Sequence, residues 1–264
     1  MPSLRTTLLW VIYICISIST VLLVTFLPIR ESISDFDTTL LCDFNSSTTV
    51  HSTKRDVVFF FATNFASGLE LSIKSLRSTG SECRIVLFCA PGFSFSQYFK
   101  RLAKELDIEI VKNCADEKKR HYVPHMIRFE FELQWLEKEM QTSANSINRI
   151  FHTDSFDVFF QGDPFSHIPD DSLIFVVEPH QIRSCGWNLA WITQCYGGAI
   201  ASKMSHCFII CSGSIAGDAA NYINLLKLMI AQTAWSRCYE PSMDQPILNY
   251  LVWNGLVDKE GIKY

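Results

Sequence analysis

Residues 149–165 read RIFHTDSFDVFFQGDPF, in which an apolar run ends on two carboxylates, Asp154 and Asp157. The apolar run needs burial and predicts a strand, and the turn residues Gly-Asp-Pro at 162–164 follow a few positions later. We therefore expect both carboxylates at the carboxyl edge of a sheet. Open α/β sheets bind their ligands at that edge.

The two neighbouring carboxylates need a reason to lie together, because like charges at short range raise each other's pKa unless a cation lies between them. A divalent metal ion would supply the cation, and oxygen ligands of this kind suit Mg²⁺ or Mn²⁺. The alternative is a solvated acidic turn in which Asp163 caps a helix. The pattern alone leaves both interpretations open.

The rest of the globular part alternates strands with helices. We expect strands at 57–61, 84–89, 108–111 and 207–211, and helices at 66–78, 96–106 and 124–140. Continuously apolar strands that alternate with helices are typical of a mostly parallel sheet covered on both faces. The sequence therefore predicts an α/β fold.

The acidic stretch resembles the motif region of eukaryotic nucleotide-sugar glycosyltransferases with a GT-A fold, in the form where the Asp-x-Asp signature becomes Asp-x-x-Asp. Other segments are similar in the same order along the chain: residues 57–76 to the first strand and helix, Arg128-Phe129 to the helix before the motif, 211–217 to the Asn-Ser-Gly segment, and Asp244-Gln245 to the late Asp-Gln pair. The resemblance spans about residues 56–253.

This resemblance implies a GT-A-like, Rossmann-type sandwich over residues 56–264. It implies transfer of a sugar from a nucleotide-sugar donor to a lumenal glycan or protein acceptor. Mn²⁺ or Mg²⁺ would be the cofactor, held by Asp154 and Asp157.

The resemblance also implies nucleotide contacts from Thr63 and Asn64, at the end of the first strand. From the residues alone, the same pair would serve as a helix cap. Ser212 and Gly213 would contact the donor where the strand 207–211 ends, since glycine permits close approach of the backbone to a ligand. A tight turn into a helix near Asp218 explains this glycine as well.

Arg128 lies on a predicted helix that is apolar on two faces and so is largely buried. A buried arginine must reach water or an anion, which we expect to be a donor diphosphate or a motif carboxylate. An ordinary structural ion pair is the alternative. We expect Asp244 to act as a catalytic base or to orient the sugar, or else to cap the helix that follows it.

Aromatic and amide side chains are a common way to hold sugars, and residues 186–198 combine them with glycine. The resemblance places this region near the acceptor, so we predict Trp191 and Gln245 as substrate-binding residues. Trp191 would equally serve as packed core.

The first residues of the chain predict a membrane anchor, because Leu8 to Leu27 is a run of 20 residues without a charge. About 20 apolar residues span a bilayer as a helix. A cleaved signal peptide, the alternative, would have a shorter apolar core and a small-residue cleavage site. We predict a cytoplasmic tail at 1–7, an anchor at 8–27 and a stem at 28–55. The protein would be a single-pass type II membrane protein that faces the Golgi or ER lumen.

Charge, a glycosylation sequence and the cysteine count agree with a protein of the secretory route that does not bind nucleic acid. The formal charge of −4 offers no basic stripe for nucleic acid, so we expect no nucleic-acid partner. The stem contains Asn45-Ser46-Ser47, a glycosylation acceptor sequence. Ten cysteines suit the secretory route, and because Cys15 lies in the predicted span the other nine cannot all pair within one molecule.

The chain departs from the family pattern after its last histidine, His206. Many members continue to a histidine that completes the metal site. The departure implies fewer protein ligands to the metal, or an incomplete or inactive protein. The competing hypothesis is a catalytically silent, membrane-anchored carbohydrate-binding or scaffolding protein on the same fold.

Overall fold

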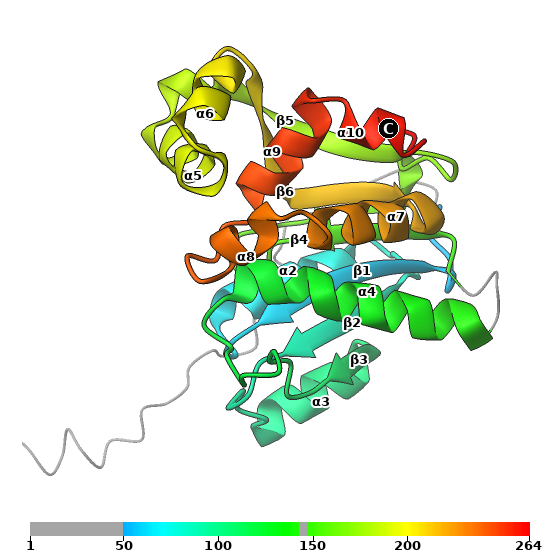
Figure 1. Cartoon of the computed structure of the whole chain (residues 1–264). Coiled ribbons are helices and arrows are strands. Elements are labelled where there is room, and N and C mark those ends of the chain that lie inside the picture. Colours follow the sequence, from blue (N-terminus) through cyan, green and yellow to red (C-terminus); the bar gives the residue numbers. More distant parts are fainter. Residues whose placement is uncertain (1–49, 143–146) are drawn as a thin grey trace, which may run out of the picture. The chain divides into compact units, whose positions relative to one another are not determined.

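The computed structural model describes residues 50–142 and 147–264. These residues form an α/β fold around a mixed sheet of six strands in the order β3-β2-β1-β4-β6-β5 (Figure 1). The strands are β1 (Asp56–Ala62), β2 (Arg84–Cys89), β3 (Ile108–Val111), β4 (Arg149–Thr153), β5 (Leu173–Gln181) and β6 (Phe208–Asp218).

The sheet is mostly parallel, as the sequence predicts. Strands β3, β2, β1 and β4 run parallel to one another, and β6 pairs antiparallel with both β4 and β5. The carboxyl ends of the parallel strands therefore share one edge, and β6 crosses that edge in the opposite direction.

Helices cover both faces of the sheet. They are α2 (Ser67–Ser78), α3 (Gln97–Glu105), α4 (Pro124–Thr142), α5 (Gly186–Tyr196), α6 (Gly198–Met204), α7 (Ala219–Ile230), α8 (Ala234–Tyr239), α9 (Gln245–Trp253) and α10 (Leu256–Lys259). Because successive strand residues point to opposite faces, β1 feeds two cores. Phe59 packs in the cluster that includes Phe129 of α4, and Phe60 packs in the one that includes Leu69 of α2.

The predicted end of the last strand at Ser212-Gly213 is wrong, because β6 continues to Asp218 and α7 follows directly. Two glycines of β6 lie at positions where atoms of neighbouring residues approach the backbone closely. A Cβ on Gly213 would lie 2.1 Å from a carboxylate oxygen of Asp154, and one on Gly217, which has φ +142°, would lie 2.1 Å from the carbonyl oxygen of Ser172. Glycine here marks crowding within a strand rather than its end.

Strands β5 and β6 extend past the carboxyl end of β4. Cys211 of β6 pairs with Val176 of β5, beyond the residues of β6 that pair with β4. Helices α5 and α6 lie between these two strands in the chain. A disulfide between Cys195 and Cys238 joins α5 to α8. The other cysteines of the described ranges are free.

The predicted anchor at 8–27, and the part of the predicted stem that contains Asn45, lie outside the described residues. Among the residues of 50–142 and 147–264, no helix is both long and apolar enough to cross a membrane.

Candidate functional site

Two adjoining cavities lie at the carboxyl edge of the parallel strands. The smaller, of about 320 Å³, and the larger, of about 580 Å³, share a wall made by Pro124, His125, Arg128 and Asp154. Thr63 and Asp157 line the smaller cavity; Trp191, Ser212, Gly213, Asp244 and Gln245 line the larger one. The structure thus brings together the predicted site residues with the exception of Asn64.

Arg128 forms the centre of the shared wall, where it binds two carboxylates. Its Nη1 donates to Oδ1 of Asp154 at 2.5 Å, and its Nη2 donates to Oδ2 of Asp244 at 2.7 Å. Arg128 and Asp244 are buried, whereas the Asp154 side chain is 42% exposed. Arg128 thus contacts a motif carboxylate, as expected, and the same contacts are those of a structural ion pair, so its role toward a donor stays a prediction.

The charges of this triad stabilise one another. Burial alone would lower the pKa of Arg128, but the carboxylates of Asp244 and Asp154 outweigh burial and raise it. Burial likewise favours the neutral form of Asp154, yet Arg128 holds the pKa of that carboxyl below its usual value. Arg128 Nε is buried and has no hydrogen-bond partner within the described ranges.

The acidic motif keeps its shape through contacts with two neighbouring elements. The Asp154 amide donates to the Gly213 carbonyl at 3.0 Å, next to the point where the Asp154 carboxylate lies over that glycine. The Ser155 hydroxyl donates to the Phe61 carbonyl at 2.8 Å and accepts from the Phe61 amide at 3.0 Å. These bonds place Asp154 beside β6 and leave the next carboxylate, Asp157, exposed at the smaller cavity.

Asp163 has a structural role, as the alternative interpretation of the acidic stretch expects. Its carboxylate accepts from the amide of Phe165 in the short 3₁₀ turn that it caps, and from the amides of His51 and Ser52. Burial opposes ionisation of Asp163, but these backbone donors lower its pKa. Asp163 therefore binds the residues before β1 to the domain and does not line either cavity.

The residues of the smaller cavity fit a divalent metal ion. Asp154 and Asp157 both line this cavity, and Mg²⁺ is commonly held by one or two carboxylates together with substrate phosphates. Among the described residues, no three His, Cys, Asp or Glu side chains gather in a group that would hold a metal on their own. A metal here would thus complete its coordination with ligand oxygens or water.

The larger cavity has an amide network on its floor and indole rings at its rim. Gln245 Nε2 donates to Asn188 Oδ1 at 2.9 Å, and Gln245 Oε1 accepts from the amide of Ser212 at 3.1 Å. The Trp187 and Trp191 rings lie 6.2 Å apart, and Trp187 is 73% exposed. A large indole this exposed is available for a ligand.

One predicted site residue differs from its expected position, and the structure decides the capping alternatives. Asn64 accepts a hydrogen bond from the Thr63 hydroxyl at 3.2 Å and does not line either cavity. Neither residue caps α2, whose N-cap is Ala66 without a side-chain bond. Asp244 does cap α9, because its Oδ1 accepts from the Gln245 amide at 2.9 Å. The capping alternative is therefore wrong for the first pair and confirmed for Asp244.

A buried polar network, which the sequence does not predict, lies next to the residues of the shared wall. Glu132, one helical turn after Arg128, lies 2.8 Å from Nδ1 of His152 and accepts from the Tyr222 hydroxyl at 2.5 Å. Burial, followed by Glu132, raises the pKa of Tyr222 well above its ordinary value. The network joins α4, which carries Arg128, to β4, which Asp154 directly follows, and to α7.

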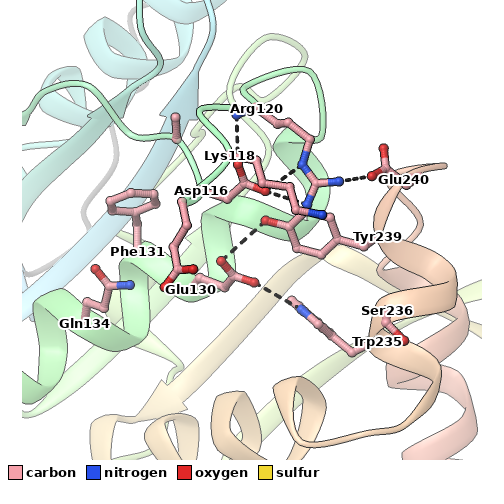
Figure 2. A pocket seen from close by; sticks show the side chains of 12 residues that line it. Asp116, Lys118, Arg120, Glu130, Phe131, Gln134, Trp235, Ser236, Tyr239 and Glu240 are labelled. Atoms are coloured by element: carbon pink, nitrogen blue, oxygen red, sulfur yellow. Dashed lines mark hydrogen bonds and ion pairs between the residues drawn. The ribbon is translucent and has the colours of Figure 1, made fainter.

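A third cavity, of about 700 Å³, lies between α8, α4 and the loop before α4 (Figure 2). Four of its charged groups are engaged with protein partners: Arg120 pairs with Asp116 and Glu240, and Glu130 accepts from Trp235 Nε1 at 3.1 Å. Figure 2 shows these side chains linked across the cavity. None of the predicted site residues lines this cavity. The side-chain contacts around it connect the loop before α4, and α4 itself, with α8 and the residue after it.

Glu178 of β5 is the carboxylate of the larger cavity that sequence reasoning missed. A signal exists, because residues 173–178 read LIFVVE, an apolar run that ends on a carboxylate as 149–154 does. Comparison with known proteins adds no assignment: no protein-family model and no curated protein matches this chain.

Proposed function

We propose that this protein is a metal-dependent glycosyltransferase with a GT-A-like fold, which moves a sugar from a nucleotide donor to a lumenal acceptor. The observation that carries the proposal is the pair of cavities divided by Arg128 and Asp154. A transferase must hold two substrates on either side of the bond it makes, and two adjoining cavities with one charged wall suit that task.

The smaller cavity is the donor side of the proposal. Thr63 lies at the end of β1, where a hydroxyl can reach a ribose or base, and Asp154 and Asp157 would hold Mn²⁺ or Mg²⁺. When bound, the metal would offset the charge of the leaving diphosphate. Arg128 keeps Asp154 ionised and fixed in place for that purpose.

Electrostatics support the need for a cation. The two cavities are lined by four carboxylates (Asp154, Asp157, Glu178 and Asp244) and one guanidinium, a formal charge of −3 with His125 neutral. A diphosphate that entered such a site alone would meet net repulsion. A divalent ion bound with the donor removes most of that repulsion.

The larger cavity is the acceptor side. Trp187 and Trp191 offer apolar ring faces, while Asn188 and Gln245 offer amide groups beside them. This combination of a flat apolar surface with hydrogen-bonding groups suits a saccharide acceptor. The predicted lumenal location would bring the cavity to the glycans of the secretory route.

Donor binding tests the proposal. The melting temperature of the full chain would be measured with a panel of UDP- and GDP-sugars, in Mn²⁺ and in chelator. A donor at about 100 times its Kd stabilises a protein by roughly 2.7 kcal/mol, which corresponds to a rise of roughly 5–10 °C. We expect Asp157→Ala to remove the Mn²⁺-dependent part of the rise, while Asp170→Ala, an exposed aspartate outside both cavities, keeps it.

The outcomes separate the two candidate functions. No rise with any nucleotide sugar would contradict donor binding, and an equal rise in chelator would contradict the metal. Binding without hydrolysis or transfer would favour the catalytically silent carbohydrate-binding protein. Donor hydrolysis in the absence of an acceptor would favour the enzyme.

A further inference from the structure

The larger cavity holds three carboxylates, and only one of them lacks a cation. Asp154 and Asp244 both pair with Arg128, whereas Glu178 forms no ion pair with any described residue. The one hydrogen bond to Glu178 in the described ranges comes from Gln245 Nε2 at 3.5 Å, at the limit of a weak bond. Glu178 is thus the carboxylate of the larger cavity that no described cation neutralises.

We propose that Glu178 is the catalytic base that takes the proton from the acceptor hydroxyl. The inference rests on the proposed function and names a residue of that same site. A general base needs a free lone pair and a position beside the group it deprotonates. Glu178 meets both needs, because its carboxylate is not neutralised by a guanidinium and it lines the cavity that also contains Trp187 and Asn188.

Asp244, which the sequence suggests for this role, is already engaged through both oxygens. Oδ2 accepts from Arg128 at 2.7 Å, and Oδ1 accepts from the Gln245 amide at 2.9 Å. A carboxylate bound to a buried guanidinium is a weak proton acceptor, because protonation would leave the cation unpaired. The geometry therefore gives Asp244 the task of fixing Arg128 and α9.

The position of Glu178 suits a base that acts opposite the leaving group. Asp154 follows β4 and Glu178 lies on β5, so the two come from strands on opposite sides of β6. Both line the larger cavity together with Cys211 of β6, whose thiol pKa is raised mainly by burial, with smaller contributions from Asp154, Glu178 and Asp244. A donor sugar held at the Asp154 side would face Glu178 across the larger cavity.

The reaction then follows as a single displacement. The acceptor hydroxyl oxygen attacks the anomeric carbon of the donor sugar, and a bond between them forms as the bond from that carbon to the diphosphate oxygen breaks. The electron pair of the broken bond leaves with the nucleoside diphosphate, and the hydroxyl proton goes to the Glu178 carboxylate. Attack from the face opposite the leaving group inverts the anomeric configuration.

The test compares the full-length wild type with Glu178→Gln, Glu178→Asp and a control, His180→Gln, an exposed residue on the same strand. The probes are UDP- and GDP-sugars with Mn²⁺, and water serves as the acceptor. We expect each variant to keep the donor-induced rise in melting temperature. Donor hydrolysis should fall about 100-fold or more in Glu178→Gln, recover in part in Glu178→Asp and stay within about 2-fold in His180→Gln.

Two further readouts distinguish a base from a merely structural residue. The hydrolysis rate of the wild type should depend on pH with an acid limb, and Glu178→Gln should lose that limb. The anomeric proton signal of the released sugar should report inversion.

The inference is overturned if Glu178→Gln hydrolyses the donor at about the wild-type rate, or if the product keeps the donor configuration. A wild type that binds a donor but does not turn it over overturns the base while leaving a binding protein. A wild type that binds no nucleotide sugar overturns the proposed function together with the base.

Discussion

Replacing Arg128 by methionine tests whether its charge holds the shared wall together. The change keeps an unbranched side chain of similar length but leaves Asp244 buried without its cation, since the Asp244 side chain is only 7% exposed. Breaking a buried ion pair by removing one partner costs about 3–5 kcal/mol. Asp154 contributes the smaller part, because its 42% exposed side chain can turn to water.

We expect this cost to appear as a fall of roughly 6–20 °C in the melting temperature of Arg128→Met, and as a lower urea midpoint in tryptophan fluorescence. Adding Asp244→Asn should restore about 1–3 kcal/mol, because asparagine caps α9 equally well and carries no charge to desolvate. The difference between wild type and Arg128→Met should shrink below about pH 4. Arg128 depresses the pKa of Asp154, so the stability from that pair is present above the unfolded pKa of about 3.9 and is lost as the pH falls through the folded value.

The reasoning is refuted if Arg128→Met loses less than about 1 kcal/mol, or if Asp244→Asn destabilises it further. Asp244→Asn alone supplies the fourth corner of a double-mutant cycle. Since Arg128 and Asp244 are in direct contact, their coupling energy should reach about 0.5–3 kcal/mol.

Three further outcomes are expected. Gly213→Ala should lower the free energy of unfolding by about 1–3 kcal/mol in urea titrations, because the added Cβ would lie 2.1 Å from the Asp154 carboxylate. The control Gly162→Ala, with open space around the added Cβ, should change that free energy by less than about 0.5 kcal/mol. Burial raises the pKa of Cys89 to about 12, so the unfolded thiol ionises first as the pH rises above about 8.5, and urea midpoints should show wild type losing about 2 kcal/mol by pH 10 relative to Cys89→Ala. If the predicted stem is lumenal, glycosidase treatment should shift the electrophoretic mobility of the wild type, and Asn45→Gln should abolish the shift.

Local pattern predicted the parallel half of this fold. The runs at 57–61 and 85–89 are continuously apolar, and each is followed by a helix, so β1 and β2 lie where the sequence places them. The position of Asp154 at the carboxyl edge of the sheet was predictable in the same way, because Asp154 comes directly after a buried strand. These are signals that neighbouring residues carry by themselves.

The antiparallel half depends on contacts that a local pattern does not contain. Gly213 resembles the end of a strand until the carboxylate of Asp154, 59 positions earlier, is placed over it. The partners of Arg128 are equally remote, since Asp244 is 116 positions away along the chain. Glu178 was missed for another reason: β5 is half exposed, and its apolar run was not counted as a strand.

The division of the site by one charged wall has a kinetic consequence. Asp157 lines only the smaller cavity, and Glu178 and Trp187 line only the larger one, so changes at these positions should act on one substrate each. Arg128 and Asp154 border both cavities, so a change in either should weaken donor binding and slow transfer together. If the two cavities are the donor and acceptor sides, Trp187→Ala should raise the KM of a saccharide acceptor and leave the KM of the donor unchanged, because the lost ring face contacts only the larger cavity. An equal rise in both values would mean that the wall does not separate the substrates, and the assignment of the two sides would fall with it.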